Sequence, residues 1–532
     1  MSTASHRAPP NKWLVTLSVS CGTLMGAIDA SIVNVALPQI RGSLGATLQE
    51  STWATTSFII ATVIVMPLTG LMGRLFGQKR AYLACLALFI VSSLLCGIAW
   101  NLPSLVIFRA LQGLGAGALT PIEQSILRQT FPPREQGMAM AIFSMVIITG
   151  PTIGPTLGGY IVDHAHWSWI FLINLPVGLL GFLLVWRFVE EPEDVSAANR
   201  AAAELQRRHM DWAGIGLLSV GLAALQFMFE EGHSKEWFDS GAITACAVVA
   251  GLCLFAFVLH ELSATAPVVD MRLFKDPVFA SGALLGVIIF LVITTNLFLL
   301  SLFMQEQLGF TAMHAGLALM PRTLLMMVTM PIVGRLYGRV STQLLIGAGL
   351  LLSGLGVYQM GSVTLDTTAR DIVGSLVLQG LGASLIFVPL NTVVFENVPR
   401  ARVADAAGVA LMLRHVGSSL SLAIFASLLP RYAAQAQGAI ATHVVAERPE
   451  VLQRLALVEG GLLARGMDMA SAHEASLRLL ADSVLRQAMV MAFDRLFLLS
   501  ALLYAVSLPL VLLLRTSAAS RASQKVHVEV EV

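Results

Sequence analysis

Apolar stretches of about 20 residues recur along the whole chain, and this pattern limits the possible folds more than any single motif does. A helix needs about 20 consecutive apolar residues to cross a hydrocarbon core of about 30 Å. Charged residues make up only 12% of the 532 residues, whereas a soluble domain has roughly 25%. The sequence therefore predicts an all-α polytopic membrane protein. Its net charge of +1 gives no indication of a nucleic-acid partner.

Fourteen membrane spans are predicted from these stretches. They cover residues 13–38, 53–73, 81–100, 104–127, 137–162, 168–187, 212–230, 240–260, 279–304, 313–334, 341–361, 371–394, 403–429 and 492–514. The first follows Arg7 and Lys12, as a signal peptide would, but its apolar run is too long for one. We therefore expect an uncleaved first span.

The distribution of Lys and Arg predicts on which side the termini lie. Twenty of these residues fall in segments on the side of the termini, and three, Arg41, Lys235 and Arg370, fall in the short segments opposite. Loops retained in the cytoplasm are enriched in Lys and Arg, so both termini are expected to be cytoplasmic. The long segment 430–491 is exempt from this rule, and its apolar residues recur at helical spacing. We expect it to form helices at or above the outer surface.

Two pairs of matching segments indicate an internal duplication. LQGLGA occurs at residues 111–116 and again at 378–383, 267 positions later. MPLTGLMGRLFGQ from Met66 and MPIVGRLYGR from Met330 match at an offset of 264. Two six-span halves that face each other, with a substrate site between them near the middle of the membrane, are typical of a secondary transporter.

The duplication predicts the domain organisation of the chain. The major facilitator fold expected from it comprises an N-terminal six-helix bundle at 13–187, a linker at 188–278 that carries two inserted helices at about 212–230 and 240–260, and a C-terminal six-helix bundle at 279–514 with the outer segment 430–491, flanked by cytoplasmic segments at 1–12 and 515–532.

Two charged residues lie deep inside predicted spans of the N-terminal half. Asp29 is the only ionisable residue between Lys12 and Arg41, and Arg109 lies about eight residues from the outer end of the fourth span. At 1.5 Å per residue the two lie at similar depth, so they can face each other. A charge near the middle of the membrane costs several kcal/mol, and such residues usually line a polar cavity or pair with one another. Proton coupling and a purely structural ion pair both agree with this pattern.

At the offset of the repeat, Asp29 falls on Asn296 and Arg109 falls on Leu376. The charges are therefore present in one half only, which indicates that the N-terminal half couples ions. Further candidates for the substrate path or for gating are the polar residues of other spans: Asn34, Gln112, Glu123, Asn296, Arg414 and His415. Glu123 also lies near Arg128, so an interfacial carboxylate is an equal alternative, and for Arg322 snorkelling to the interface is favoured.

The fifth span contains the segment GPTIGPTLGGYIVD from Gly150. Gly150, Gly154 and Gly158 recur every four residues and form a stripe without side chains on one helix face, which permits close packing. Pro151 and Pro155 each remove a helix hydrogen bond and are expected to bend the span. Together with Gly159 these residues are interpreted as a hinge or seal between the halves, with tight packing alone as the alternative.

Several motifs of soluble enzymes are absent from the sequence. No G-x-x-x-x-G-K-[ST] phosphate loop, G-x-S-x-G elbow or H-E-x-x-H metal motif occurs. The five cysteines lie in apolar runs without metal-ligand spacing. We therefore expect no enzymatic activity, no metal and no cofactor, and transport driven by an ion gradient.

The sequence is similar to a known family at five segments: AIDASIVNVALP, RALQGLGAGALTP, GPTIGPTLGG, WSWIFLINLPVG and LRHVGSSLSLA. They resemble the fourteen-span drug:proton antiporters of the major facilitator superfamily, the EmrB/QacA type, and among these the EmrB-like multidrug efflux pumps. The resemblance implies proton-driven export of hydrophobic drugs or toxic compounds across the inner membrane, with Asp29 and Arg109 in the coupling positions. It also implies a periplasmic adaptor (membrane fusion protein) and an outer-membrane channel as partners.

One position departs from the superfamily. The loop between the second and third spans, GRLFGQKR from Gly73, usually carries an Asp where this chain has Arg74. The usual gating ion pair is therefore not carried over, and Glu123 is a candidate for a substitute acid. Two alternatives to drug export stay open: a proton-coupled or facilitative exporter of one metabolite or fatty acid, and a membrane receptor or enzyme that does not transport.

Overall fold

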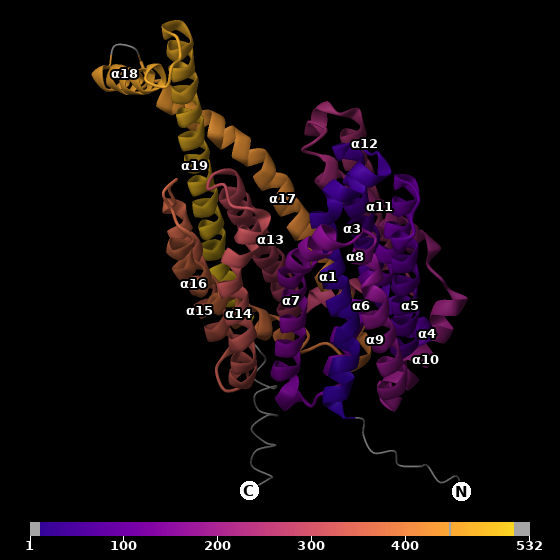
Figure 1. Ribbon diagram of the computed structural model, residues 1–532. Coiled ribbons are helices and arrows are strands. Elements are labelled where there is room, and N and C mark those ends of the chain that lie inside the picture. Colours follow the sequence, from indigo (N-terminus) through magenta and orange to yellow (C-terminus); the bar gives the residue numbers. More distant parts are fainter. Residues whose placement is uncertain (1–10, 446–447, 515–532) are drawn as a thin grey trace, which may run out of the picture.

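The computed structural model describes residues 11–445 and 448–514, and nearly all of these residues are helical (Figure 1). Among them, fourteen helices are long and apolar enough to cross a membrane. Each contains most of one predicted span, so the predicted all-helical polytopic fold is confirmed. The expected cytoplasmic segment 515–532 and residues 1–10 lie outside the described residues.

The N-terminal half consists of six spans, some of them interrupted. Its elements are α1 (Lys12–Leu44), α2 (Leu48–Ser51), α3 (Trp53–Val65), η1 (Met66–Leu68), α4 (Thr69–Phe76), α5 (Gln78–Gly97), α6 (Leu102–Thr130), η2 (Pro133–Glu135), α7 (Gln136–His164), α8 (Trp169–Leu172) and α9 (Asn174–Phe188). The second span is interrupted at Pro67, which has no backbone N–H to donate within a helix, and the chain forms a short 3₁₀ turn there.

A linker with two inserted spans separates this half from the C-terminal half. The linker contains α10 (Glu193–Arg208), α11 (Trp212–Glu231), η3 (Trp237–Asp239), α12 (Gly241–Ser263) and η4 (Met271–Lys275). The C-terminal half contains α13 (Pro277–Glu306), α14 (Ala312–Leu336), α15 (Thr342–Gln359), η5 (Met360–Ser362), α16 (Ala369–Val393), η6 (Arg400–Arg402), α17 (Val403–Ala441), α18 (Pro449–Leu463) and α19 (Met469–Val511).

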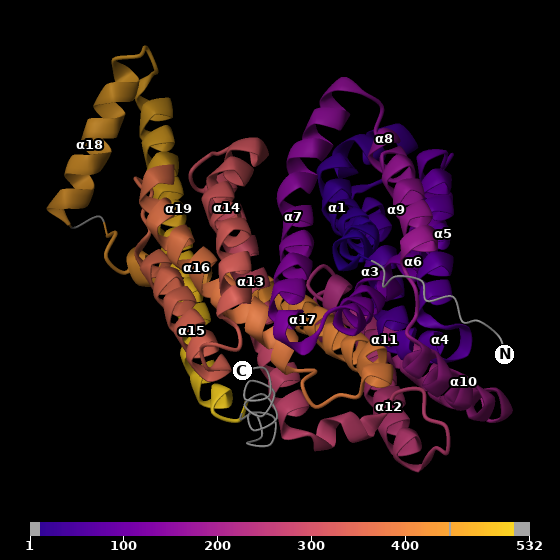
Figure 2. The same ribbon diagram turned by 90° about the horizontal axis from the view of Figure 1, so that it is seen from below.

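The two halves lie side by side (Figures 1 and 2), and α1 begins on the same side of the helices as α19 ends (Figure 1). We call the side on which α1 begins and α19 ends the termini face. The opposite side, from which α18 projects, is called the α18 face. The two faces are thus defined by the ends of α1 and α19 and by the position of α18, and their names do not refer to a compartment of the cell.

The repeated LQGLGA motif makes equivalent contacts in the two halves. A Cβ on Gly115 of α6 would lie 2.8 Å from the Cys85 carbonyl oxygen of α5, and glycine alone permits this approach. A Cβ on Gly382 of α16, 267 positions later, would lie 2.5 Å from the Gly349 carbonyl oxygen of α15. Small residues at the same point of each repeat therefore bring corresponding helices close together, as expected for a duplicated bundle.

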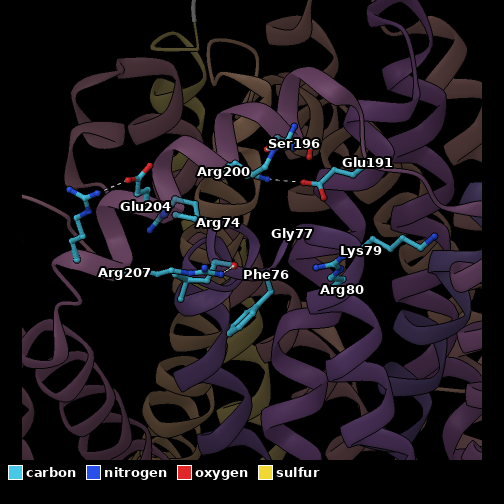
Figure 3. A pocket seen from close by; sticks show the side chains of 14 residues that line it. Arg74, Phe76, Gly77, Lys79, Arg80, Glu191, Ser196, Arg200, Glu204 and Arg207 are labelled. Atoms are coloured by element: carbon cyan, nitrogen blue, oxygen red, sulfur yellow. Dashed lines mark hydrogen bonds and ion pairs between the residues drawn. The ribbon is translucent and has the colours of Figure 1, made fainter. Parts of the chain in front are cut away.

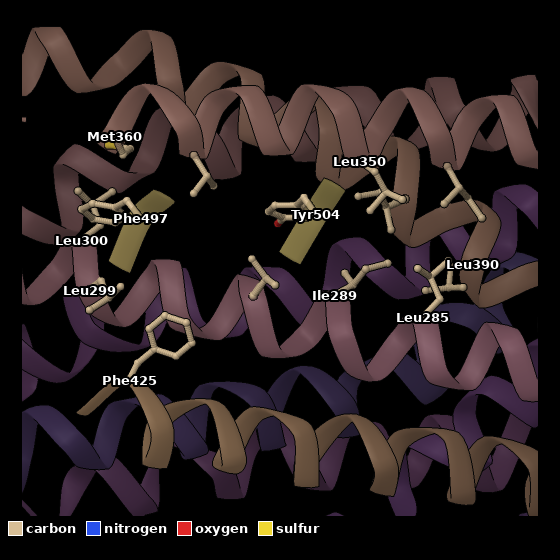
Figure 4. Close-up of a cluster of buried hydrophobic side chains, with 14 of the residues drawn as sticks. Leu285, Ile289, Leu299, Leu300, Leu350, Met360, Leu390, Phe425, Phe497 and Tyr504 are labelled. Carbon is tan, nitrogen blue, oxygen red and sulfur yellow. The ribbon is translucent and has the colours of Figure 1, made fainter. Parts of the chain in front are cut away.

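Each half has its own apolar core. The core of the C-terminal half is drawn in Figure 4, where Leu285 and Ile289 of α13 lie opposite Leu350 of α15, with Tyr504 of α19 next to them. Phe497 of α19 lies farther along the same core, beside Leu300 and Met360. A separate cluster around Tyr82, Phe89 and Phe143 fills the N-terminal half. Buried side chains of this size fix the helices of each half relative to one another, so each half is built to move as a unit.

The inserted helix α11 packs at the seam between the two halves. Leu218 and Leu222 of α11 form one buried cluster with Val63 of α3 and Val409 of α17. Gln226 Nε2 of α11 donates to Ser419 Oγ of α17 at 2.5 Å. Helix α12 lies outside α11 and is mostly exposed, because only 17% of the residues in its most apolar stretch are buried. The insertion therefore covers the α3/α17 seam from the side.

Two helices are longer than the sequence predicted. Helix α17 has 39 residues and α19 has 43, which at 1.5 Å per residue is about 60 Å for each, roughly twice the hydrocarbon core. They continue past the predicted limits at 429 and 492 because their polar extensions keep helical periodicity, and Pro430 does not end α17. Helices α17 and α19 thus extend beyond the α18 face, where α18 connects them (Figure 1).

Candidate functional site

A buried ion pair joins the first and fourth spans of the N-terminal half. Asp29 lies in α1 and Arg109 in α6, and neither side chain has exposed surface. Arg109 Nη1 lies 2.5 Å from Asp29 Oδ2. The structure therefore brings together Asp29 and Arg109, which the sequence predicted to lie at similar depth in the membrane. Their role in proton coupling stays a prediction.

Two side-chain amides bind the second oxygen of the Asp29 carboxylate. Gln112 Nε2 donates to Asp29 Oδ1 at 2.9 Å, and Asn174 Nδ2 donates to the same oxygen at 2.8 Å. Ser93 Oγ accepts from both amides and donates to the Phe171 carbonyl oxygen at 2.9 Å. A buried carboxylate is costly unless it is paired and hydrogen-bonded, and this one has an ion pair and two donors.

The Arg109 guanidinium is also well supported. Its Nε donates to the Ala54 carbonyl oxygen of α3 at 2.9 Å, and its Nη1 donates to Gln112 Oε1 at 2.7 Å. The guanidinium carbon lies 4.2 Å from the centre of the Phe58 ring, within range of a cation–π interaction. Only Nη2 has no hydrogen-bond partner among the described residues. The N-terminal charges thus form a nearly saturated network.

Ser93 and Asn174 belong to this network, although the sequence analysis did not select them. Ser93 follows Ser92 in an otherwise apolar stretch of the third span, and Asn174 lies within the WSWIFLINLPVG segment. An asparagine that is 2% exposed in such a span needs a polar partner, and that was the available signal. Gln112, a predicted candidate, is part of the network.

Two other predicted candidates of this half lie outside the network. Asn34 is exposed and accepts a long hydrogen bond from Thr55, at 3.4 Å. Glu123 is fully buried, and its Oε1 accepts from Ser20 Oγ at 2.8 Å. No ion pair within the described residues involves Glu123, and its Oε2 has no hydrogen-bond partner there.

An ion pair between Arg74 and Asp405 connects the two halves. Arg74 Nη1 of α4 contacts Asp405 Oδ1 of α17, and the two side chains are 15% and 4% exposed. Arg74 Nη2 also donates to the Val268 carbonyl oxygen at 3.2 Å. The acid that partners Arg74 is therefore Asp405 and not Glu123. The proposal of Glu123 as substitute acid was wrong, because Glu123 points into the core of its own half.

Other contacts close the termini face at the seam between the halves. Arg128 Nη1 of α6 donates to the Thr392 carbonyl oxygen of α16 at 3.1 Å. Gln129 Nε2 donates to the Arg400 carbonyl oxygen at 3.3 Å. A Cβ on Gly137 of α7 would lie only 2.8 Å from the Gly334 carbonyl oxygen of α14. In this conformation the halves are in direct contact near the termini face.

The glycine stripe of α7 faces the first span and not the other half. A Cβ on Gly158 would lie 2.7 Å from Ile32 Cγ1 of α1, and Gly150 and Gly154 approach Ala27 and Ser31 in the same way. This differs from the expected place of the stripe at the interface between halves. The stripe serves close packing within the N-terminal half.

Other residues of the same segment lie away from this contact. Gly159 has no neighbour that a Cβ would meet within 4 Å. Pro151 is exposed and Pro155 is half-buried. The seam with the other half uses a different face of α7, where Thr152 Oγ1 donates to Thr323 Oγ1 of α14 at 3.1 Å. A hinge at these residues stays a prediction.

The C-terminal half contains polar groups but no equivalent of the Asp29–Arg109 pair. Asn296 donates to the Val292 carbonyl oxygen of its own helix at 2.7 Å, and its Oδ1 has no partner among the described residues. His415 of α17 is exposed despite its place within a span. Arg322 of α14 is 9% exposed, so its side chain is buried and does not reach the interface as expected. Leu376, at the position of Arg109, is fully buried.

Arg414 is the most buried cation of this half, with a side chain 2% exposed. Its Nη1 donates to Asn391 Oδ1 of α16 at 2.6 Å. Asn391 Nδ2 in turn donates to Ser144 Oγ of α7 at 3.0 Å. The hydrogen-bonded chain from Arg414 therefore crosses from one half to the other.

A basic pocket of about 670 Å³ lies on the termini face, and Arg74 of the Arg74–Asp405 pair is one of the residues that line it (Figure 3). Cationic side chains of Lys79, Arg80, Arg200 and Arg207 line it, and they come from the start of α5 and from the linker helix α10. The pocket is open to the surface, and the predicted site residues lie elsewhere.

The described residues contain no group of three or more His, Cys, Asp or Glu side chains able to hold a metal ion. The five cysteines are free thiols and are at least partly buried.

Comparisons with known proteins agree with this architecture. Residues 19–422 match the Major Facilitator Superfamily. The chain is 32% identical over 497 residues to the fatty acid resistance protein FarB of Neisseria gonorrhoeae, covering 93% of this chain and 95% of that protein. It is 36% identical over 430 residues to the multidrug export protein EmrB of Haemophilus influenzae, with coverages of 80% and 82%. Identity to EmrB of Escherichia coli K12 is 30% over 501 residues, with coverages of 94% and 94%.

Two solved structures have the same fold. The human organic anion transporter MFSD10 superposes with a TM-score of 0.60 at 15% identity, covering 93% of this chain and 100% of that chain. The proton:xylose symporter XylE superposes with a TM-score of 0.57 at 13% identity, with coverages of 92% and 94%. At such low identity these likenesses concern the fold alone.

Proposed function

Because the chain belongs to the Major Facilitator Superfamily, we propose that it is a transporter and not an enzyme, and that it exports hydrophobic and amphipathic compounds in exchange for protons. Two of the relatives, EmrB of Haemophilus influenzae and EmrB of Escherichia coli, are multidrug export proteins, and this supports drug export over export of a single metabolite. No cofactor is needed, because the proton gradient supplies the free energy.

The observation that carries the proposal is the buried pair of Asp29 and Arg109. Both charges lie within spans of one half, and the pair has no exposed surface. Ionisable residues in membrane spans are expensive to keep and commonly serve proton or substrate pathways. A carboxylate whose environment changes between conformations can bind a proton in one state and release it in the other.

Alternating access gives this pair its role. Protonation of Asp29 would remove one of the two charges and weaken its hold on Arg109, Gln112 and Asn174. The halves are held together at the termini face in the present conformation by Arg74 and Asp405. Rocking of the halves would break these contacts and make the opposite contacts, and proton binding would be coupled to that exchange.

The termini face is proposed to be cytoplasmic and the α18 face periplasmic, in the inner membrane. The excess of Lys and Arg at the termini face supports this orientation. The extensions of α17 and α19, together with α18, would then reach into the periplasm. Such an arm supports a tripartite assembly with a periplasmic adaptor and an outer-membrane channel.

Transport by purified protein in proteoliposomes tests the proposed coupling. We expect wild-type protein to accumulate ethidium against its gradient under an imposed proton gradient, and Asp29→Asn protein to lose this accumulation. Asp366→Asn is a matched control, because Asp366 is an exposed aspartate of a loop. Downhill ethidium flux measured without a proton gradient checks that the Asp29→Asn variant is still folded.

Each outcome of this experiment has a clear meaning. Uphill accumulation by Asp29→Asn protein equal to that of wild type would show that Asp29 does not couple protons. No ethidium flux by wild-type protein in either condition would contradict the proposed export itself. Loss of accumulation with retained downhill flux supports the assignment.

A further inference from the structure

Arg414 is a buried cation for which the described residues offer no carboxylate. The side chain is 2% exposed, and none of the ion pairs among those residues includes it. Asn391 is its one side-chain hydrogen-bond partner there. Buried charges are normally paired, so a site for an anion beside Arg414 would complete the environment of this guanidinium.

The two unpartnered nitrogens of Arg414 form one edge of its guanidinium. Nη1 is bound by Asn391, whereas Nε and Nη2 have no partner among the described residues. In arginine, Nε and Nη2 lie on the same side of the planar group and point their N–H bonds in parallel. This edge matches the two oxygens of a carboxylate, the geometry in which arginine binds such groups most specifically.

Gly286 and Phe290 of α13 lie beside this edge. A Cβ on Gly286 of α13 would lie 2.8 Å from Nε, so any larger residue there would obstruct it. The guanidinium carbon lies 5.3 Å from the centre of the Phe290 ring, which supports the cation without neutralising it. In the present closed conformation Nε and Nη2 have almost no accessible surface, so an anion reaches them only after the helices around them separate.

Access to Arg414 depends on the seam between the halves. Ser144, Gly286 and Arg414 lie 8, 9 and 11 residues from the termini-face ends of α7, α13 and α17, which places them about 12–17 Å from that face. The Asn391–Ser144 hydrogen bond crosses the seam at this depth. Separation of the halves at the termini face would break this bond and open a path to Arg414.

Resting on the export activity proposed above, we propose that Arg414 binds the carboxylate of amphipathic organic anions when the halves separate at the termini face. Closure of the seam then restores the Asn391–Ser144 bond and expels the anion from the guanidinium edge. Arg414 would therefore make carboxylates a preferred class among the exported compounds.

Two aromatic probes of opposite charge test this proposal. One is 1-naphthoate, an amphipathic carboxylate, and the other is ethidium, an aromatic cation. Uptake of each is measured in everted membrane vesicles energised with NADH, and the ratio of the two initial rates is the readout. This ratio corrects for differences in the amount of folded protein.

Three variants separate the possible roles of Arg414. We expect Arg414→Gln to lower the naphthoate-to-ethidium ratio at least tenfold. Gly286→Ala should also lower it, because the added methyl group obstructs Nε. Arg431→Gln is the control, because Arg431 lies in the same helix but is exposed, and it should leave the ratio at the wild-type value.

The outcomes distinguish this proposal from the one on which it rests. An unchanged ratio in Arg414→Gln vesicles, or equal loss of both probes, would overturn the role in anion binding. Uptake of ethidium but not naphthoate by the wild type would also overturn it, while leaving export intact. Uptake of neither probe by the wild type would instead contradict the proposed export.

Discussion

The two halves share one fold but treat buried charge in opposite ways. In the N-terminal half, Asp29 and Arg109 pair with each other, and the amides of Gln112 and Asn174 complete the carboxylate's hydrogen bonds. In the C-terminal half, Arg414 has an amide partner and a guanidinium edge without one. Duplication therefore preserved the helix packing, while the charges diverged. The Asp29–Arg109 pair, in which each charge has its partner, suits a change of protonation inside the protein. The unpartnered edge of the Arg414 guanidinium suits the binding of a ligand.

Removal of one charge from the closed pair should have the largest effect. Arg109→Gln leaves the Asp29 carboxylate buried without its cation, and breaking a buried pair in this way costs about 3–5 kcal/mol. We expect a marked loss of thermal stability in detergent and loss of ethidium export. The double variant Asp29→Asn/Arg109→Gln should regain much of the stability but not the export.

The double variant decides whether the two residues act as a pair. If Arg109→Gln alone were as stable as the double variant, the ion pair would contribute nothing to stability, and the contrast between the halves would lose its basis.

Reversal of one charge in the Arg74–Asp405 pair, which connects the halves, should have the next largest effect. Arg74→Asp and Asp405→Arg each place like charges together at the termini face, and contact pairs of this kind couple by about 2 kcal/mol. We expect each single variant to favour separation of the halves there. The double variant with both substitutions should restore the closed state.

Positions 80 and 339 are exposed residues on the termini face, one in each half. Spin labels attached there would report the separation as a longer label-to-label distance in double electron–electron resonance. Equal distances in the wild type and both single variants would show that the Arg74–Asp405 contact does not hold the halves closed.

A smaller effect is expected within the α7 stripe of the N-terminal half. A methyl group at Gly154 would overlap Ser31 of α1, and overpacking of this kind costs about 1–3 kcal/mol. Gly159→Ala is the matched control, because no neighbour lies within 4 Å of a Cβ there. Thermal unfolding of the two variants compares them. Equal melting temperatures would mean that α1 and α7 are less tightly packed than their glycines indicate.

The smallest effect is expected from making the C-terminal half resemble the other half. Asn391→Asp would place a carboxylate next to Arg414 Nη1 and neutralise the cation internally. We expect the apparent affinity for 1-naphthoate to fall about fivefold, or about 1 kcal/mol, with ethidium uptake unchanged. Uptake of naphthoate at increasing concentrations gives this affinity. A tighter affinity in the variant would contradict an anion site at Arg414.

The sequence predicted the fold because long apolar runs and the LQGLGA repeat are local signals. It also selected Asp29, Arg109 and Gln112, which share one network, because isolated polar residues in apolar spans are conspicuous. The Arg74–Asp405 pair was missed because its members are 331 positions apart and belong to different halves. No local pattern encodes how two halves meet.

The glycine stripe shows a second limit of local patterns. The four-residue period correctly indicated a face for close packing, but it did not identify the partner, which is α1 and not the other half. Likewise, helical spacing alone could not give the ends of α17 and α19, because periodicity continues where the membrane ends. Partner and boundary both depend on tertiary contacts.

The inserted helices give the molecule two unlike flanks. At the α3/α17 seam, α11 lies over the junction of the halves, and its Gln226 is bonded to Ser419. At the α7/α14 seam on the other side (Figure 2), the two halves meet without such a cover. The junction of the halves is therefore covered by an inserted helix on one flank, whereas on the other flank α7 and α14 themselves form the outer surface of the junction.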